Sequence, residues 1–239
     1  MQITYYRYRK DVLRMRSRDL KYIVGLLKEN KEAEDILFVR QKLNMVFLAR
    51  TADLSGKLPV LVFGATFKKD AGTFLWHVLT QTVLLFYKGA HWEVNGLESK
   101  SEAEDIRREA AALPQTLLAF VGLSGRSVKI VVPFVLPDGS LPRKEEQARM
   151  FHAAAYQLAV RHYQPQLSSI ISLKDPLLSR GCRMSFDPDA YYNPDAAAIR
   201  FEQPLRMPDG GDLKIVPAPS ADPLERMVPG AERNGQIAT

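Results

Sequence analysis

Residues 116–134, with the sequence TLLAFVGLSGRSVKIVVPF, carry the clearest fold signal in the chain. Two apolar runs, 116–122 and 127–134, are rich in β-branched and aromatic residues, and the short segment 123–126 separates them. Residues of these types favour strands, and a short turn joins consecutive strands as an antiparallel hairpin. This stretch therefore predicts a buried β-hairpin.

Other apolar runs on both sides of this stretch also predict strands. They are residues 2–9, 60–67, 82–87, 90–95, 168–173 and 182–186. The tyrosines of the first run suit the half-exposed surface of an edge strand. One alternative stays open, because residues 74–87 also have the composition of a buried helix and periodicity does not separate the two.

Helical periodicity appears in segments between these strands. The predicted helices are residues 17–28, 33–47, 101–113 and 144–163. Apolar residues of the first recur from Leu20 to Leu27 at i, i+3, i+4 and i+7, and Ser17 is its candidate cap. Ser101 and Glu104 form a capping box for the third, which must end before the following proline. Because helices and strands mix without strict βα alternation, we expect an α+β fold.

The composition is that of an ordinary globular protein, with 239 residues of which 46% are hydrophobic and 25% charged. A single cysteine, Cys182, excludes an intramolecular disulfide framework and a cysteine-rich zinc site. No segment approaches the roughly 18 uninterrupted apolar residues of a membrane span, and the N-terminal region lacks the apolar core of a signal peptide. We therefore expect a soluble cytoplasmic protein that does not bind a membrane.

The net charge of +6 is concentrated at one end of the sequence. Residues 1–21 carry a net charge of +5, whereas the other 218 residues carry +1. The basic residues of this stripe are Arg7, Arg9, Lys10, Arg14, Arg16, Arg18 and Lys21. One interpretation is a track for a phosphate backbone, with Tyr5, Tyr6 and Tyr8 as stacking surfaces for bases. The other is a solvated, charged edge of the fold.

The turn of the predicted hairpin is a candidate phosphate site. Ser124 and Gly125 form a small flexible turn, and Arg126 and Lys129 add two cations ahead of a buried strand. Backbone N–H groups of such a turn can bind a phosphate whose charge the cations balance. Ser-Gly turns between strands are also common without any ligand, so an ordinary turn remains the alternative.

Residues 180–195 contain a second group of charged residues. Arg180 and Arg183 lie three residues apart and suit either a phosphate or pairing with neighbouring carboxylates. The loop 187–195 offers Asp and Asn oxygens to a hard cation, but it lacks the glycine and the terminal glutamate of a calcium-binding hand. Its proline steps are typical of turns, which is the simpler interpretation.

The predicted strand 90–95 places Glu93 and Asn95 on one face, because side chains alternate along a strand. Carboxylates paired in this way hold divalent metals for phosphoryl transfer. The amide of Asn95 carries no charge, so this pair is expected to bind a metal more weakly than two carboxylates would.

Three stretches together resemble the VirE-N-like domain, found at the front of primase-helicase proteins of bacterial conjugative transposons and related mobile elements. They are residues 58–67 (LPVLVFGATF), 117–130 (LLAFVGLSGRSVKI) and 179–194 (SRGCRMSFDPDAYYNP). That domain is grouped with the archaeo-eukaryotic primase-polymerase superfamily. The resemblance implies one domain over residues 1–205, followed by a Pro/Gly-rich tail or linker over residues 206–239.

The resemblance implies a primase-polymerase-like domain with an RRM-like, mixed or antiparallel sheet flanked by helices. Such a domain joins nucleotides on a single-stranded template with two divalent metal ions, Mg²⁺ or Mn²⁺. Its Asp-x-Asp metal motif matches Glu93 and Asn95 here. Its Ser-x-His-type turn matches Ser124 and Gly125, with Lys129 where many relatives have histidine.

The catalytic motifs of the superfamily are degenerate in this sequence. The third motif, a later aspartate, has only the offset counterpart Asp175. Compared with Asp-x-Asp, a Glu-x-Asn pair has one negative charge fewer, and the side chain of glutamate is longer than that of aspartate. Two-metal geometry is therefore difficult to retain around Glu93, the charged ligand that is left. We therefore expect catalysis by Glu93, Asn95 and Asp175 to be weak or lost, and we expect no structural cofactor.

The phosphate contacts implied by the resemblance and by the basic stripe are better preserved. The residues expected to bind phosphate or nucleic acid are Ser124, Gly125, Arg126, Lys129, Arg180, Arg183, Arg7, Arg9, Lys10 and Arg14. We expect single-stranded or primed DNA as the ligand and a helicase or primase as the candidate protein partner. Two alternatives remain: an active DNA primase or polymerase, and an accessory protein-interaction subunit of the replication or excision machinery.

Overall fold

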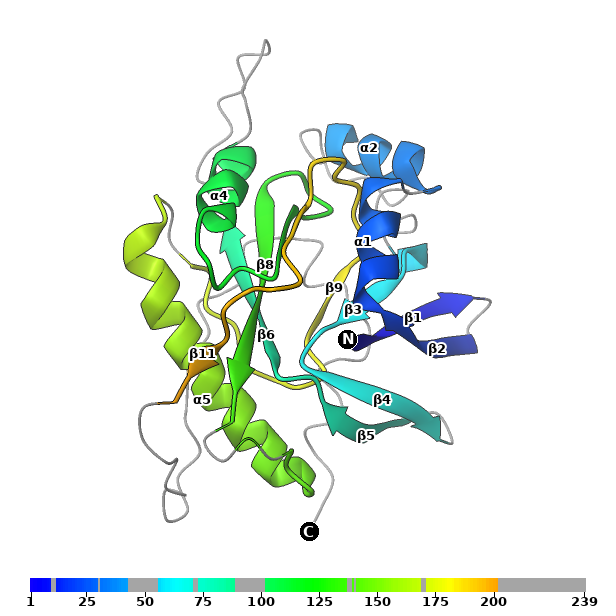
Figure 1. Cartoon of the computed structure of the whole chain (residues 1–239). Helices are drawn as coiled ribbons and strands as arrows, with labels where there is room; N and C mark the ends of the chain where they lie inside the picture. Colours follow the sequence, from blue (N-terminus) through cyan, green and yellow to red (C-terminus); the bar gives the residue numbers. More distant parts are fainter. Residues whose placement is uncertain are drawn as a thin grey trace.

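The computed structural model combines helices with several mainly antiparallel sheets, which confirms the predicted α+β class (Figure 1). It describes residues 1–9, 12–29, 31–42, 56–70, 73–88, 102–136, 139, 141–168 and 171–201. The helices are α1 (Leu20–Lys28), α2 (Ala33–Lys42), α4 (Glu102–Ala111) and α5 (Glu145–Tyr163), and the 3-10 helix Gln164–Gln166 follows α5. The strands are β1 (Gln2–Arg9), β2 (Val12–Asp19), β3 (Val60–Val62), β4 (Ala65–Asp70), β5 (Thr73–Leu79), β6 (Thr82–Lys88), β7 (Leu118–Val121), β8 (Ser127–Val135), β9 (Gly181–Arg183), β10 (Tyr191–Tyr192) and β11 (Ile199–Arg200).

A central sheet forms around β8, the second strand of the predicted hairpin. β8 pairs antiparallel with β7 and with β6, and Lys129 lies opposite both Phe120 and Phe86. β10 extends the sheet beyond β7, and β11 pairs in parallel with the end of β8. The hairpin predicted from residues 116–134 is therefore confirmed, and it lies within a mixed sheet.

A second sheet, here called the N-terminal sheet, has the strand order β2-β1-β3-β9 and is antiparallel throughout. β1 lies between β2 and β3, so the prediction of an edge strand over residues 2–9 is wrong. The predicted helix 17–28 also begins later, because residues 17–19 belong to β2. Asp19, not Ser17, caps α1: its Oδ1 accepts the Lys21 N–H at 2.9 Å.

The predicted strand 60–67 is divided into β3 and β4 at Gly64. A Cβ at this position would lie 2.8 Å from Nε2 of His152 and 3.0 Å from the carbonyl oxygen of Leu178, so the backbone passes very close to α5 and the segment before β9. β4 pairs with β5 in a separate two-stranded sheet. Residues 73–79 and 82–88 are thus strands, which excludes the alternative of a buried helix over 74–87.

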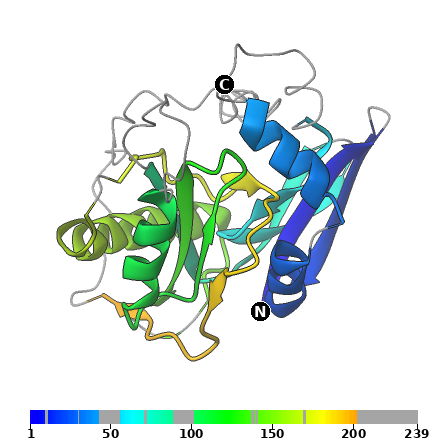
Figure 2. The same ribbon diagram turned by 90° about the horizontal axis from the view of Figure 1, so that it is seen from above.

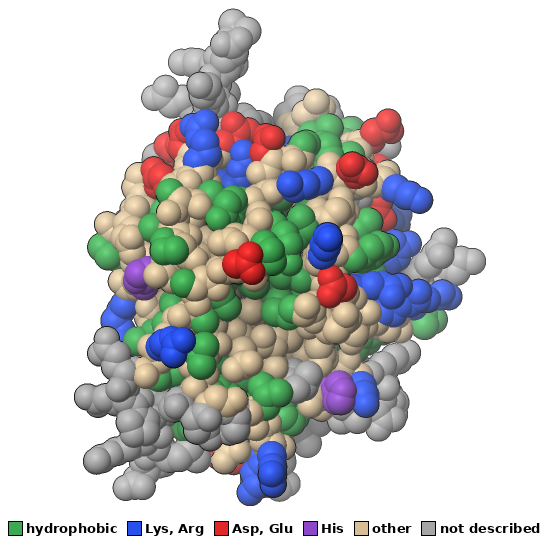
Figure 3. Space-filling model, viewed as in Figure 1, with side chains coloured by type: hydrophobic (Ala, Val, Ile, Leu, Met, Phe, Trp, Pro, Cys, Tyr) green, Lys and Arg blue, Asp and Glu red, His purple; other side chains and the backbone are tan. Residues whose placement is uncertain are grey.

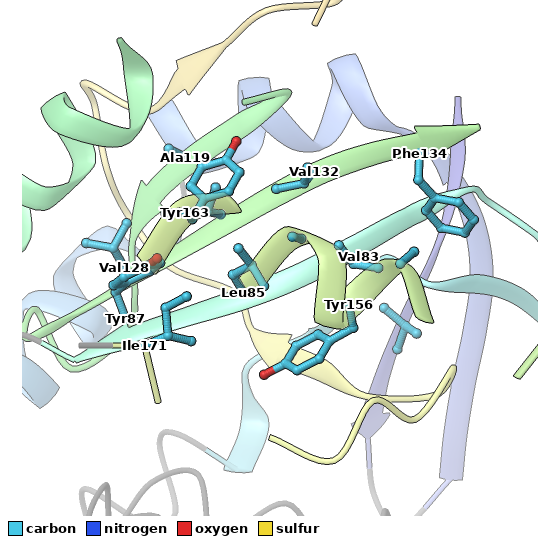
Figure 4. Packing of buried hydrophobic residues seen from close by; sticks show 14 of the residues in the cluster. Val83, Leu85, Tyr87, Ala119, Val128, Val132, Phe134, Tyr156, Tyr163 and Ile171 are labelled. Atoms are coloured by element: carbon cyan, nitrogen blue, oxygen red, sulfur yellow. The ribbon is translucent and has the colours of Figure 1, made fainter. Parts of the chain in front are cut away.

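Two hydrophobic clusters cover the two faces of the central sheet. The larger cluster packs Val83, Leu85 and Val132 of the sheet against Tyr156 and Tyr163 of α5 (Figure 4). On the other face, side chains of β6, β7 and β8 pack with α1 and the N-terminal sheet. Figure 2 shows the resulting arrangement, with α4 and α5 on one side of the central sheet and β1 and β2 on the other side of the molecule.

The remaining sequence predictions have mixed outcomes. The helix 144–163 is confirmed as α5, whereas the third helix ends at Ala111 instead of residue 113. In the described part of the predicted strand 168–173, Ile171 forms an isolated bridge with Tyr87. The strand predicted at 182–186 is shorter, because β9 ends at Arg183. The predicted strand 90–95, the cap Ser101 and the tail 206–239 lie outside the described residues. Within the described ranges, no helix is both long and apolar enough to cross a membrane.

Candidate nucleic-acid interface

The turn of the β7–β8 hairpin is folded against the protein. Gly125 has a φ of 73°, a left-handed conformation that glycine adopts without steric cost, and its N–H donates to the Gly122 carbonyl at 2.9 Å. The Arg126 N–H donates to the buried Ser124 hydroxyl at 3.3 Å. The N–H groups of Gly125 and Arg126 therefore have acceptors within the turn, as in an ordinary tight turn.

Arg40 of α2 holds this turn against the segment that follows β9. Its guanidinium donates to the carbonyl oxygens of Gly122 at 3.1 Å and Leu123 at 3.2 Å. It also donates to the Ser185 hydroxyl at 3.0 Å and the Phe186 carbonyl at 2.7 Å. Burial lowers the pKa of Arg40, while nearby carboxylates favour its charged form. Arg40 thus joins two of the three stretches that carried the family resemblance.

Replacing Arg40 with alanine is expected to lower the free energy of unfolding by about 2 kcal/mol, because four oxygen acceptors lose a charged donor together. Arg40→Lys keeps the charge but not the branched donor geometry, so it is expected to recover only part of this loss. Urea unfolding checks both variants against Lys28→Ala, which removes an exposed cation from α1. An Arg40→Ala loss no larger than that of Lys28→Ala would contradict a structural role.

Asp187, a predicted oxygen ligand for a cation, is instead the acceptor at the centre of a buried polar cluster. Its carboxylate pairs with the buried Arg107 of α4 and accepts the Val121 N–H at 2.7 Å and the Asp189 N–H at 3.2 Å. Later in the loop, the Asp195 N–H donates to Oδ1 of Asn193 at 3.0 Å. These contacts support the interpretation of residues 187–195 as structured turns.

The predicted metal site is only partly covered by the residues that the structure describes. Glu93 and Asn95 lie outside the described residues, so their predicted roles stay predictions. The described residues contain no group of three or more His, Cys, Asp or Glu side chains that could hold a metal ion. Binding of Mg²⁺ or Mn²⁺ by Glu93, Asn95 and Asp175 therefore stays a prediction.

Lys129 is buried on the central sheet, with its Nζ 4.1 Å from the centroid of the Phe86 ring. A second buried lysine, Lys174, approaches the same ring with its Nζ at 5.8 Å. The structure thus brings the lysine of the turn motif close to the segment that carries Asp175. Because only 4% of Lys129 is exposed, it does not belong to a solvent-facing track with the basic stripe.

Arg180 and Arg183 both donate to backbone oxygens. The Arg180 Nε donates to the Asp175 carbonyl at 2.7 Å. The Arg183 Nη1 donates to the carbonyls of Gly56 at 3.1 Å and Leu58 at 3.2 Å, and burial lowers the pKa of Arg183. Arg183 is therefore built into the fold, and only Arg180 is partly accessible to a phosphate.

Four arginines of the basic stripe lie on one face of the β1–β2 hairpin. In the antiparallel register, Ile3 lies opposite Arg18, Tyr5 opposite Arg16, and Arg7 opposite Arg14. Opposite residues of two antiparallel strands project to the same side, so these side chains share a face. We call Arg7, Arg14, Arg16 and Arg18 the arginine face. Basic side chains gather over β1 and β2 on the right of Figure 3.

Tyrosines contribute to the arginine face differently from the prediction. Tyr5 shares the face, whereas Tyr6 and Tyr8 project to the opposite side, where Tyr6 is buried in the core. Tyr22 of α1 takes their place: it is 55% exposed, and the Arg18 guanidinium lies 5.8 Å from its ring centroid. The side chain of Arg9 and all of Lys10 lie outside the described residues.

Comparison with known families adds one decisive match. The model of the BT4734-like, N-terminal domain family matches residues 53–192, which is more than half of the chain. The chain belongs to the BT4734-like N-terminal domain family. No curated protein and no solved structure matches the chain. The matched part of this BT4734-like domain contains the turn at 122–126 and the Arg107–Asp187 pair, while the arginine face and Arg40 precede it.

Sequence reasoning missed the buried Arg107 and the partly buried Arg40 of this BT4734-like domain, although each has a detectable signal. The buried positions of α4 are Ala103, Ile106, Arg107 and Ala110, the i, i+3, i+4, i+7 spacing of a helix face. Arg40 likewise lies four residues after the buried Ile36. A charged residue on an apolar helix stripe indicates a buried partner, because an unpaired charge there is very costly.

Proposed function

We propose that this BT4734-like domain binds nucleic acid, with single-stranded or primed DNA as its ligand. The observation that carries the proposal is the arginine face, which gathers four guanidinium groups on one side of a two-stranded hairpin. Arginine is well suited to phosphate oxygens because its planar fork can donate two parallel hydrogen bonds. The resemblance to VirE-N-like domains supports a role in the replication or transfer of a bacterial mobile element, with a helicase or primase as the protein partner.

The electrostatics of the hairpin favour an anionic ligand. Arg14 and Arg16 are exposed, and Arg7 lies directly opposite Arg14. Like charges directly opposite each other destabilise a strand pair, and a bound phosphate would relieve this cost. One carboxylate, Glu32, pairs with the arginine face through Arg7 at 3.2 Å. The exposed arginines of β2 are therefore the proposed first contacts with DNA.

In this proposal DNA binds to the β1–β2 hairpin, and the joining of nucleotides is weakened or lost. Lys129 and Arg183 are buried, so they do not lengthen the phosphate-binding surface formed by the arginine face. The uncharged Asn95, two residues after Glu93 in the sequence, argues against efficient two-metal catalysis. Primer synthesis with Mg²⁺ or Mn²⁺ that is abolished by Glu93→Gln would show instead that catalysis is retained.

Binding of single-stranded DNA is expected to weaken steeply with salt. Contacts from Arg14, Arg16 and Arg18 to three phosphates would give a log–log slope of roughly −2, because each phosphate contact on a single strand contributes about −0.7. Arg14→Ala/Arg16→Ala removes two of these contacts and should reduce the slope to roughly −0.7. Fluorescence anisotropy of a labelled oligonucleotide over a salt series measures both values.

A charge-matched control distinguishes a specific face from general attraction. Arg143→Ala/Lys144→Ala removes two exposed cations just before α5, away from the hairpin, and leaves the same net charge as Arg14→Ala/Arg16→Ala. Only the hairpin variant should lose salt-dependent binding. Equal losses in both variants, or no binding of single-stranded DNA at low salt, would rule out the arginine face as the DNA site.

A further inference from the structure

We infer that the arginine face selects single strands over duplexes, with Tyr22 as a stacking surface for one base and Arg14, Arg16 and Arg18 as a row of phosphate contacts. This inference rests on the proposed nucleic-acid function. It adds which residues contact the phosphates and which residue of the chain distinguishes single strands from duplexes.

The spacing of the arginines matches an extended polyanion. Arg14, Arg16 and Arg18 alternate along β2, so neighbours in the row are two residues, or about 7 Å, apart. All three project to the same side of the hairpin. A nucleic-acid strand carries one phosphate per nucleotide, and in an extended conformation it can follow such a row. The row therefore suits about three successive phosphates of one strand.

An aromatic surface lies at one end of this row. Tyr22 is 55% exposed, and its ring is next to the guanidinium of Arg18. Tyr5, which lies opposite Arg16 on the same face, is partly buried. The ring of Tyr22 and the Arg18 guanidinium together present the type of surface on which an unpaired base stacks.

The position of Tyr22 is held by the packing of α1. The other side of this helix buries Leu20, Ile23, Val24 and Leu27 in the cluster between α1 and the two larger sheets. A stacking residue on a packed helix loses little conformational freedom when a base binds. Tyr22 is thus a preorganised contact beside the flexible arginines.

Selectivity follows from which groups each ligand exposes. A duplex offers its phosphates to the arginines, but its bases are stacked and paired inside the helix and do not reach Tyr22. A single strand offers both phosphates and bases. An acidic peptide offers only carboxylates, so it could match the arginine row but would gain nothing comparable from the Tyr22 ring. Of these three ligands, only the single strand can contact both the arginine row and the Tyr22 ring.

The test compares Tyr22→Ala and Tyr22→Phe in the full chain, using anisotropy with labelled oligothymidylates and with a duplex of equal length. We expect Tyr22→Ala to weaken single-strand binding about tenfold and leave duplex binding unchanged. Tyr22→Phe keeps the ring and should bind like the original protein. Leu37→Ala, which removes an exposed apolar side chain from α2, is the matched control. Affinity should rise with oligonucleotide length up to about four nucleotides and then level off.

The possible results distinguish a failure of this inference from a failure of the proposed nucleic-acid function. No binding to either single strands or duplexes would contradict the nucleic-acid function itself. Salt-dependent binding that does not prefer single strands and does not change in Tyr22→Ala would overturn only the stacking role. Displacement of the oligonucleotide by a poly-glutamate peptide of comparable affinity would also overturn the inference, in favour of an acidic protein partner.

Discussion

Replacing Asp187 with alanine is expected to lower the free energy of unfolding by about 3–5 kcal/mol, because it leaves a buried guanidinium without its buried counterion. Both partners are nearly inaccessible, with side-chain exposures of 9% for Arg107 and 4% for Asp187. The same carboxylate also accepts the backbone N–H groups of Val121 and Asp189. The substitution therefore removes the ion pair and the link between the end of β7 and the loop after β9 in one step.

Equilibrium unfolding in urea measures this loss, and two further variants define its cause. Asp189→Ala is the matched control, because this side chain is 80% exposed and lies 3.6 Å from the same arginine; its effect should stay within about 1 kcal/mol. Asp187→Asn keeps an oxygen acceptor but not the charge, so most of the loss should remain. If Asp187→Asn were as stable as the original protein, the ion pair would not be the source of the stabilisation.

Local sequence patterns predicted the parts of the fold that depend on neighbouring residues. The hairpin of β7 and β8 follows from two apolar runs and the short segment between them, and α5 follows from a long periodic stretch. Both signals lie within about 20 residues, so no distant partner is needed to interpret them. The mixed α+β class followed from the order of such segments.

Distant contacts decided the features that the sequence predicted wrongly. β1 has strand composition, but its interior position depends on pairing with β3, which lies more than fifty residues later. The division between β3 and β4 reflects the close approach of His152 and Leu178 to Gly64. Neither neighbour can be identified from the apolar run itself.

The candidate site shows the same division between local and distant information. Charge counting located the basic stripe, but the strand register decided which side chains share a face with its arginines. Tyr5 shares the arginine face, whereas Tyr6 and Tyr8 project to the other side and Tyr22 comes from a helix. Spacing alone cannot reveal a contact such as Arg18 with Tyr22, because it requires the turn from β2 into α1.

Acidification is expected to destabilise this protein through His152. The side chain is buried on α5, its Nδ1 lies 2.9 Å from the Pro176 carbonyl, and burial lowers its pKa from the ordinary 6.5 to about 4. Above about pH 6.5 the residue is neutral in both folded and unfolded chains and makes no pH-dependent contribution. Between about pH 6.5 and pH 4 only the unfolded chain binds the proton, so stability falls by an amount on the order of 3 kcal/mol. Below about pH 4 both states are protonated, and this contribution stops changing.

The difference in the free energy of unfolding between the original protein and His152→Asn isolates this effect. Carboxylates that titrate in the same pH range contribute equally to both proteins. His152→Asn cannot titrate and keeps an N–H donor near the Nδ1 position, so it should be less stable than the original protein near pH 7 but lose less stability on acidification. The gap between their free energies of unfolding should therefore narrow between about pH 6.5 and pH 4. His162→Asn, on the same helix but partly exposed, controls for the replacement of a histidine by asparagine. A gap that stays constant with pH would show that His152 is protonated as readily in the folded chain as in the unfolded one, and the tight packing of α5 against Gly64 would then have to open to admit the charge.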